Sequence, residues 1–351
     1  MDKKVYVAMS GGVDSSVAAA LLKERGFSIV GVYMKTWSPE GQPCLWKEER
    51  RDAMRVCAQL NIPFKTWDFT AEYKNRVVDY MIKEYAAGRT PNPDVMCNKE
   101  IKFGLFFDKA ISEGANYVAT GHYVKKTHNL KPITYNLVRA RALEKDQSYF
   151  LWTLNQKHLE RALFPIGEFE SKAAVREHAR QKGLATAEKK DSQGVCFVGP
   201  INVYEFLRRH IPAVPGPVIT VGGRKIGSHT GLPFYTIGQR EGIGVGGTGP
   251  YYVARKESAT NTLVVAPPAE EEALMSRELT ATNVNWVGRV PADGDNVQAS
   301  VRYRQEPVPA RIRNQELGIR VVFDTPVRAI TPGQSVVFYK GDEVLGGGII
   351  V

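Results

Sequence analysis

The sequence predicts an α/β protein: a doubly wound parallel sheet, then a small glycine-rich linking domain, then a carboxyl-terminal antiparallel β-barrel or sandwich. Three observations predict this order. Strand-like runs alternate with helical patterns over the first 120 residues, 11 of the 32 glycines lie between Gly216 and Gly249, and short strand patterns follow residue 274. We therefore expect domains at residues 1–200, 201–273 and 274–351 of the 351-residue chain.

The first domain is predicted from apolar runs with the length of buried strands. These runs alternate with helical patterns at Val17–Arg25 and Arg51–Leu60, and they are Val5–Met9, Ser28–Met34, Phe64–Phe69 and Tyr117–Thr120. Alternating strands and helices indicate a parallel sheet. Ligands of such sheets bind beyond the carboxyl ends of the strands, so Ser10–Ser16, Met34 and Gly121 should lie on one rim.

The two later domains are predicted from glycine content and strand patterning. Glycine disfavours helices, so residues 201–273 should form loops and short strands. Farther on, turn residues separate short alternating segments, namely Asn296–Tyr303, Ala310–Arg313, Arg320–Phe323, Ser335–Tyr339 and Val344–Val351. This pattern is typical of a small antiparallel barrel or sandwich.

Four arginines flank the Glu306–Pro309 turn of this last domain. Arg302 and Arg304 precede the turn at strand spacing, and Arg311 and Arg313 follow it, so each pair should share a face. Whether both pairs share the same face depends on the hairpin register, which the sequence leaves open. The cluster favours contact with a phosphate backbone over a solvated edge.

Composition and charge restrict the class of protein. The 47 Lys and Arg against 37 Asp and Glu give a net charge of +10, which suits either a polyanionic partner or a merely basic soluble protein. The amino terminus has no apolar signal segment, and no stretch reaches the ~18 apolar residues of a membrane span. We expect a cytoplasmic protein with no membrane partner.

An apolar strand, a glycine turn and a helix start follow one another at Val5–Ser16, as in a phosphate-binding loop. Gly11 and Gly12 let backbone N–H groups face an anion, serine hydroxyls add donors, and the helix directs its positive end to the same place. Asp14, a carboxylate among phosphates, indicates a bridging Mg²⁺. The absence of a Gly-Lys dipeptide excludes the P-loop of kinases and GTPases. The competing interpretation is a glycine turn before an ordinary helix.

The four cysteines include no Cys-x-x-Cys pair, which argues against a structural zinc site and a disulfide framework. Cys57 shares a helical spacing with buried positions, so we expect it to be a small core residue. Cys44 lies in a predicted loop, and its role stays open.

The other two cysteines lie beside lysines. Cys97 follows two prolines, and Lys99 and Lys102 come within a turn of what looks like a helix start, a setting that favours a thiolate. Cys196 follows a pair of lysines in a glycine-flanked segment. Taken singly, each fits a core cysteine slightly better than a reactive one.

The sequence also resembles a known family. Ser10-Gly-Gly-Val-Asp-Ser15 is similar to the PP-loop of the ATP pyrophosphatase superfamily, whose members adenylate an oxygen of their substrate and release pyrophosphate. Six further blocks resemble, in order and across nearly the whole chain, the bacterial tRNA-specific 2-thiouridylases. They are Thr90–Asn98, Ala119–Tyr123, Lys145–Leu151, Asp191–Cys196, Tyr235–Arg240 and Thr331–Gln334.

The resemblance implies an enzyme that uses ATP and Mg²⁺ to replace the 2-oxygen of the wobble uridine of tRNA with sulfur, in Lys, Glu and Gln isoacceptors. A cysteine desulfurase or a sulfur-relay protein would supply persulfide sulfur to Cys196, and Cys97 would be the second catalytic cysteine. The resemblance implies a nucleotide site formed by Ala8, Met9, Ser10, Gly11, Gly12, Val13, Asp14, Ser15, Met34 and Gly121. It implies contacts to the target base or to tRNA from Asn92, Pro93, Asp94, His122, Lys145, Asp146, Gln147, Arg302, Tyr303 and Gln334.

Three other interpretations remain open. An ATP pyrophosphatase that aminates its substrate, such as an argininosuccinate or GMP synthetase, would need neither paired thiols nor tRNA. A tRNA-binding protein that uses ATP as a switch would release no pyrophosphate. An iron–sulfur cluster on Cys97, Cys196 and a third ligand is compatible with the spacing but is not predicted.

Overall fold

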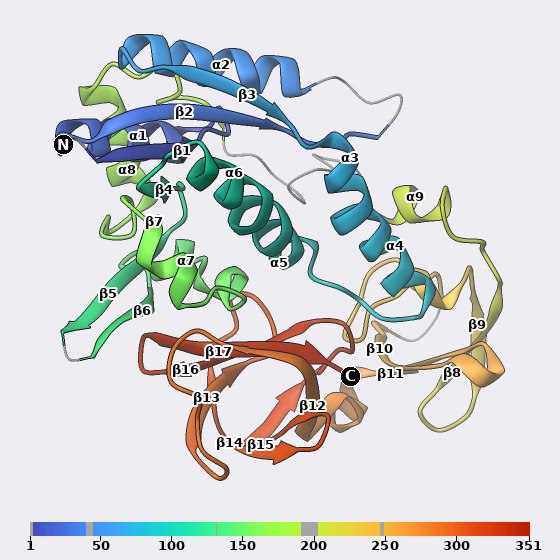
Figure 1. The fold of residues 1–351 in the computed structure, drawn as a ribbon. Coiled ribbons are helices and arrows are strands. Elements are labelled where there is room, and N and C mark those ends of the chain that lie inside the picture. Colours follow the sequence, from blue (N-terminus) through green and yellow to red (C-terminus); the bar gives the residue numbers. More distant parts are fainter. Residues whose placement is uncertain (1–2, 40–44, 131, 191–202, 246–248) are drawn as a thin grey trace.

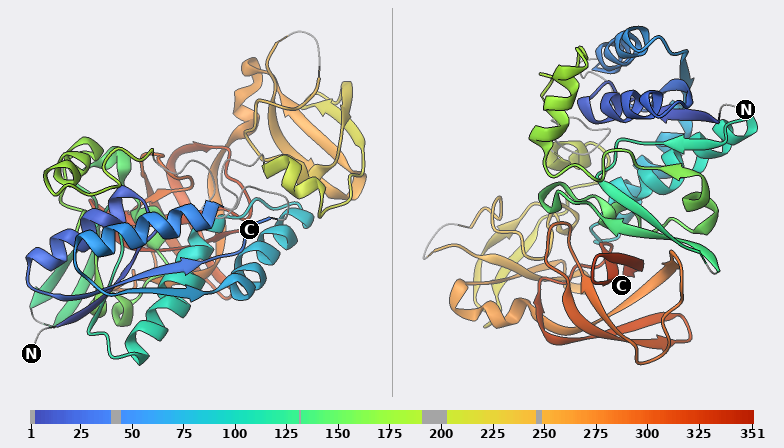
Figure 2. Two further views of the ribbon diagram at one scale, coloured as in Figure 1. Left: turned by 90° about the horizontal axis from the view of Figure 1, so that it is seen from above. Right: turned by 90° about the vertical axis from the view of Figure 1, so that its left-hand side faces the viewer.

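The computed structural model describes residues 3–39, 45–130, 132–190, 203–245 and 249–351. Figure 1 shows an α/β part that lies against a barrel, with a smaller third part beside both. Two further views show that this smaller part projects from one side of the molecule (Figure 2). None of the helices in the described ranges is long and apolar enough to cross a membrane.

The α/β part is built on a five-stranded sheet in which every pairing is parallel, as predicted. The strands, in their order across the sheet, are β3 (Phe64–Asp68), β2 (Ser28–Lys35), β1 (Lys4–Ala8), β4 (Tyr117–Ala119) and β7 (Ala162–Leu163). Strand β1 is central and alternates between two cores. Val5 and Val7 belong to one core, and Tyr6 and Ala8 belong to the other.

Helices cover both faces of this sheet. The core around Val5 and Val7 receives α1 (Val13–Glu24), α2 (Leu45–Gln59) and α8 (Lys172–Gln181). The opposite face receives α3 (Thr70–Tyr73), α4 (Asp79–Ala86), α5 (Pro93–Met96) and α6 (Phe107–Ser112), with π-helical turns at Lys74–Val78 and Cys97–Phe106 between them. The predicted helices are confirmed, but α1 begins at Val13 and α2 at Leu45, earlier than the apolar patterns indicate.

The smaller part holds a mixed sheet in the order β10-β11-β8-β9, in which only β11 and β8 run parallel. Its elements are α9 (Val203–Arg208), β8 (Gly216–Thr220), β9 (Lys225–His229), β10 (Tyr252–Glu257) and β11 (Thr262–Ala266). The described helix is short, as the glycine content predicts.

The third part is a closed six-stranded antiparallel barrel. Its strands are β12 (Met275–Trp286), β13 (Asn296–Ser300), β14 (Val308–Gln315), β15 (Gly318–Arg328), β16 (Ser335–Lys340) and β17 (Glu343–Ile350). Pairing of β12 with both β15 and β17 closes the ring, which selects the barrel over the sandwich. The first strand, β12, was not among the predicted segments. Ile312, Val321 and Phe338 fill the interior.

The α/β part contributes a hairpin to the barrel sheet. Strands β5 (Val124–Leu130) and β6 (Ile133–Arg139) pair with each other, and β6 extends the sheet at β17. Nearby, α7 (Gln156–Arg161) begins with Gln156, whose amide donates to the carbonyl of Val287 at 2.7 Å. The α/β part and the barrel therefore share backbone pairing and side-chain hydrogen bonds.

A second junction joins the segment before α5 to the turn before β16. The Asn92 amide donates to Gln334 Oε1 at 2.9 Å and accepts from the Ser335 N–H at 2.6 Å. Gln334 in turn donates to the Thr90 carbonyl at 2.8 Å. The side chains of Asn92 and Gln334 therefore hold the two parts together, and their predicted contact with tRNA stays a prediction.

Gly333 makes this junction possible, so its replacement is a test of it. Gly333 has φ +92°, and an added Cβ would lie 2.9 Å from the Thr90 nitrogen. We expect Gly333→Ala to destabilise the protein by about 2–5 kcal/mol, because left-handed strain and a backbone clash add. Gly341→Ala is the matched control, since its φ is +58° and nothing lies within 4 Å. Urea unfolding followed by tryptophan fluorescence measures both, and equal losses would contradict the junction.

Candidate active site

A cavity of about 440 Å³ lies at the carboxyl ends of β1 and β2. Its wall includes Met9, Ser10, Gly12, Val13 and Met34, which confirms that the loop and Met34 lie on one rim. The wall also has an excess of positive charge. Its cationic residues are Lys102, Lys145, Lys172, Lys189, Lys190 and Arg304, and its carboxylates are Asp14 and Glu49. Such a cavity suits a polyanion.

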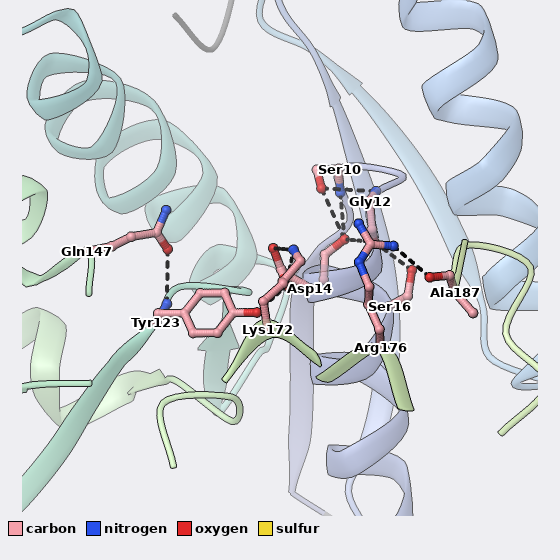
Figure 3. Close-up of polar contacts among 10 residues, drawn as sticks. Ser10, Gly12, Asp14, Ser16, Tyr123, Gln147, Lys172, Arg176 and Ala187 are labelled. Carbon is pink, nitrogen blue, oxygen red and sulfur yellow. Dashed lines mark hydrogen bonds and ion pairs between the residues drawn. The ribbon is translucent and has the colours of Figure 1, made fainter. Parts of the chain in front are cut away.

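The loop at residues 10–12 is held by its own serines (Figure 3). The Ser10 N–H donates to Ser15 Oγ at 3.1 Å, and Ser16 Oγ donates to the Gly12 carbonyl at 2.8 Å. Gly11 has φ +75°, and an added Cβ would lie 2.2 Å from the Glu49 carbonyl oxygen, so only glycine fits there. Gly12 is the N-cap of α1 and makes no side-chain cap, which leaves the first-turn N–H groups of this helix for an anion.

Three hydrogen bonds from two residues hold the Asp14 carboxylate. Lys172 Nζ donates to both oxygens, at 2.9 and 2.8 Å, and the Tyr123 hydroxyl donates to Oδ1 at 2.8 Å. Gln147 Oε1 accepts from the Tyr123 N–H at 3.0 Å and so fixes that residue. The sequence pointed to Mg²⁺ as the cation beside Asp14, whereas here the cation is the Lys172 ammonium.

The described residues fit Mg²⁺ only together with a nucleotide. They contain no cluster of three His, Cys, Asp or Glu side chains that would hold a metal ion. Asp14 offers carboxylate oxygen, which Mg²⁺ prefers, and Mg²⁺ commonly completes its shell with water and substrate phosphates. Cys97 belongs to no such cluster among the described residues, and Cys44 and Cys196 lie outside them.

Gly121 does not line the cavity but packs against the start of α1, which does. A Cβ there would lie 2.7 Å from the Ser15 nitrogen, so the residue allows the end of β4 to approach the loop closely. Sequence reasoning did not place Glu49, Tyr123 or Lys172 in the site, because they come from separate elements. The signal available for Lys172 was a lysine directly after the helix-capping Ser171.

Cys97 lines the cavity and is 5% exposed. The sequence setting favours a thiolate at Cys97, although Cys97 taken singly fits a core position slightly better, and the structure shows the buried position. Helix α5 begins at Pro93, a full turn earlier, and burial raises the pKa of the Cys97 thiol. The Lys102 ammonium and a Tyr73 hydrogen bond lower that pKa, but less than burial raises it. Lys99 instead pairs with Glu100 at 3.4 Å.

Lys102 connects Cys97 to His122. Lys102 Nζ lies 3.4 Å from His122 Nε2, and Thr120 Oγ1 lies 2.8 Å from His122 Nδ1. Burial, followed by the charge of Lys102, holds the pKa of His122 well below its usual value. His122 is therefore a buried neutral imidazole, and its predicted contact with tRNA stays a prediction.

The side chains of the Lys145–Gln147 segment lie partly in the cavity wall and partly in the protein interior. Lys145 and Gln147 line the cavity. Asp146 is buried and accepts from the Ala140 N–H at 2.8 Å and from Ser148 Oγ at 2.6 Å. Burial raises the pKa of Asp146, and these hydrogen bonds oppose the rise. Asp94, itself one of the predicted base contacts, has one buried carboxylate oxygen with no hydrogen bond from any described residue, and its contact with the base stays a prediction.

The strand spacing predicted for Arg302 and Arg304 is wrong, because β13 ends at Ser300. The Arg302 guanidinium turns inward and donates to the carbonyls of Ile237 and Ala329, at 2.6 and 3.1 Å. Arg304 has φ +64° and lies over the Tyr303 ring at 5.2 Å, and both line the cavity. The tRNA contacts predicted for Arg302 and Tyr303 stay predictions.

The other two arginines behave as the spacing indicates. Arg311 and Arg313 lie in β14 with exposed side chains two residues apart, on one face. Cys57 is also as predicted, since it is buried and burial raises its pKa to about 12.

Comparison with known proteins matches the chain in three consecutive pieces. Residues 3–200 match the tRNA methyl transferase HUP domain, residues 204–267 the tRNA methyl transferase PRC-barrel domain, and residues 276–350 the aminomethyltransferase beta-barrel domain. A solved complex of a 4-thiouridine synthetase with RNA and ATP is 19% identical, covering 60% of this chain and 50% of that one, with a TM-score of 0.40. That likeness is too low to carry an argument.

Two relatives cover the chain almost completely. The tRNA-specific 2-thiouridylase MnmA of Geobacillus thermodenitrificans is 48% identical over 99% of this chain and 95% of its own length. The protein of the same name from Shewanella putrefaciens is 47% identical over 99% of this chain and 96% of its own length. At this identity over its full length, the chain belongs to the tRNA-specific 2-thiouridylase family.

Proposed function

We propose that this protein is a tRNA-uridine 2-sulfurtransferase that uses ATP to replace the 2-oxygen of the wobble uridine with sulfur. One observation carries the proposal: the phosphate-binding loop, Cys97 and Tyr303 line the same cationic cavity. Family membership supports tRNA as the substrate. We further propose Lys, Glu and Gln isoacceptors as substrates, and a desulfurase or sulfur-relay protein as the donor of persulfide sulfur.

The first step is activation of the uracil 2-oxygen. A carbonyl oxygen is a poor leaving group, so its attack on the α-phosphate of ATP, with loss of pyrophosphate, converts it to an AMP ester that leaves readily. The N–H groups of the first turn of α1 and the loop serines would bind the phosphates. Asp14 would hold the Mg²⁺ that arrives with ATP and neutralises phosphate charge.

The second step transfers sulfur. The terminal sulfur of a Cys196 persulfide attacks the activated carbon and AMP departs, which leaves carbon joined to Cys196 through two sulfurs. The Cys97 thiolate then attacks the Cys196 sulfur, the sulfur–sulfur bond breaks, and its electron pair remains on the new thiouridine. A Cys97–Cys196 disulfide forms, and a thiol reductant must reduce it before the next turnover.

The aminating alternative explains less of this cavity. An amide-forming ATP pyrophosphatase needs the loop and a cation, but it has no use for a cysteine in the cavity wall. The location of Cys97 beside Lys102 therefore favours sulfur transfer.

The products test the adenylation step. With Mg²⁺, unmodified tRNA and a persulfide donor, the protein should convert ATP to AMP and pyrophosphate and form 2-thiouridine, detected by nucleoside mass spectrometry. Asp14→Ala should lower AMP formation at least about 100-fold, because it removes the carboxylate beside the phosphates. Asp79→Ala, which breaks the exposed 2.8 Å pair with Lys74, is the control and should be fully active. ADP and phosphate as main products would contradict the proposal.

The two cysteines should fail at different steps. Cys196→Ser should accept no sulfur, because a hydroxyl neither carries sulfane sulfur nor ionises near neutral pH. Cys97→Ser should load sulfur on Cys196 but stall before release, and should form no disulfide with it. Both variants should still adenylate tRNA. Mass spectrometry after one round with labelled donor distinguishes them, and sulfur on Cys97 of the Cys196→Ser protein with thiolation intact would reverse the assignment.

Lys102 should control the reactivity of Cys97. Because its ammonium lowers the pKa of the buried thiol, Lys102→Met should move Cys97 alkylation to higher pH and slow it at any fixed pH below the thiol pKa. Lys99→Met is the control, since Lys99 pairs with Glu100. Peptide mass spectrometry after iodoacetamide treatment resolves the four cysteines. Equal effects of the two substitutions would show that Lys102 has no special influence.

A further inference from the structure

Helices α1 and α8 run parallel and are joined by an ion pair at each end. Asp14 and Lys172 pair at the amino-terminal ends, and Glu24 and Lys182 pair at the carboxyl-terminal ends, at 2.6 Å. The two pairs differ in their surroundings. Asp14 and Lys172 have side chains 30% and 15% exposed and line the cavity, whereas Glu24 and Lys182 are each 41% exposed and do not.

Lys172 lies where helix electrostatics disfavour it. The first turn of a helix carries partial positive charge and prefers Asp or Glu. Helix α8 has no acidic residue in its first turn, and Lys172 directly follows the cap Ser171, whose Oγ accepts from the Ala174 N–H at 3.2 Å. A lysine in the first turn of a helix goes against this preference, and such an exception in a cavity wall indicates a functional constraint. The amino-terminal ends of α1 and α8 thus lie beside the Lys172 ammonium, and all three are positively charged.

We propose that Lys172 is a phosphate-binding residue for ATP, held at the cavity by Asp14 until magnesium and nucleotide bind together. This inference rests on the proposed function, because its ligand is ATP. On binding, Asp14 exchanges the Lys172 ammonium for Mg²⁺, and Lys172 donates to the phosphate chain instead. The phosphate-binding lysine that the loop itself lacks is therefore supplied from α8.

The geometry supports an exchange. Lys172 Nζ uses both carboxylate oxygens of Asp14, and an oxygen that binds Mg²⁺ at about 2.1 Å leaves little room for the ammonium. The Tyr123 hydroxyl also donates to Asp14 Oδ1, and Gln147 holds the Tyr123 backbone. Asp14 therefore keeps its position when Lys172 leaves. The competing explanation is a strut that only fixes α8 against α1.

A series of ligands with increasing phosphate number separates these explanations. Calorimetry with adenosine, AMP and ATP, each with Mg²⁺, measures binding without tRNA or turnover. Lys172→Met should leave adenosine affinity within about 2-fold and weaken ATP about 10- to 100-fold, as expected for loss of a charge-assisted hydrogen bond. Lys172→Arg should recover part of the ATP affinity. Lys182→Met, which breaks the other pair between the same helices, should change neither affinity.

A second variant tests the exchange without removing the lysine. In Asp14→Asn, Lys172 no longer has to leave a carboxylate, so ATP without Mg²⁺ should bind at least as tightly as it does to the wild type. Weaker Mg²⁺-free binding in this variant would contradict the exchange. The Asp14→Asn variant also keeps the proposal testable if Lys172→Met folds poorly.

The outcomes separate this inference from the proposed function. If Lys172→Met lowers adenosine and ATP affinity equally, or lowers neither, Lys172 is a strut and the inference is rejected while the proposed function stands. If the wild type binds ATP no more tightly than adenosine, there is no phosphate site at the loop. The proposed function then fails, and this inference fails with it.

Discussion

The side-chain amide of Asn92 fixes the arrangement on which the site depends. Asn92 is the N-cap residue of α5, yet its side chain makes no cap to that helix, because its two polar atoms bond Gln334 and Ser335 of the barrel segment. Helix α5 leads directly into the turn that carries Cys97. One amide therefore connects the position of Cys97 to that of the barrel, whose Tyr303 and Arg304 complete the cavity wall. Loss of the bond to Ser335 would leave the N–H of a fully buried residue unpaired.

Burial and charge act in opposite directions in this cavity, and the balance differs between sites. At Cys97 burial outweighs the ammonium of Lys102, so the pKa of the thiol is raised. At Asp14 the partner ammonium donates directly to both oxygens, so the carboxylate stays paired. The same cavity thus holds a paired carboxylate and a thiol whose pKa burial raises.

Local patterns predicted most of the fold, whereas long-range contacts decided the details of the site. The apolar run Val5–Met9 predicted strand β1, and the glycine turn after it predicted the loop that lines the cavity. The burial of Cys97 depends on Tyr73 and on the helices packed around it, so neighbouring lysines in sequence were a poor guide. Arg302 shows the same limit, because its acceptors Ile237 and Ala329 lie 65 and 27 residues away.

The inward turn of Arg302 joins the barrel to the glycine-rich part. Its guanidinium donates to a carbonyl of the glycine-rich part and to one after β15, which fixes the segment that ends in Tyr303 and Arg304. The hairpin β5–β6 and the Asn92 amide fix the barrel to the α/β part. Backbone carbonyls are acceptors that no side-chain substitution removes, so a substitution abolishes these two hydrogen bonds only if it replaces Arg302 itself. Tyr303 lies three residues beyond Ser300, where β13 ends, so this part of the cavity wall depends on the position of the barrel.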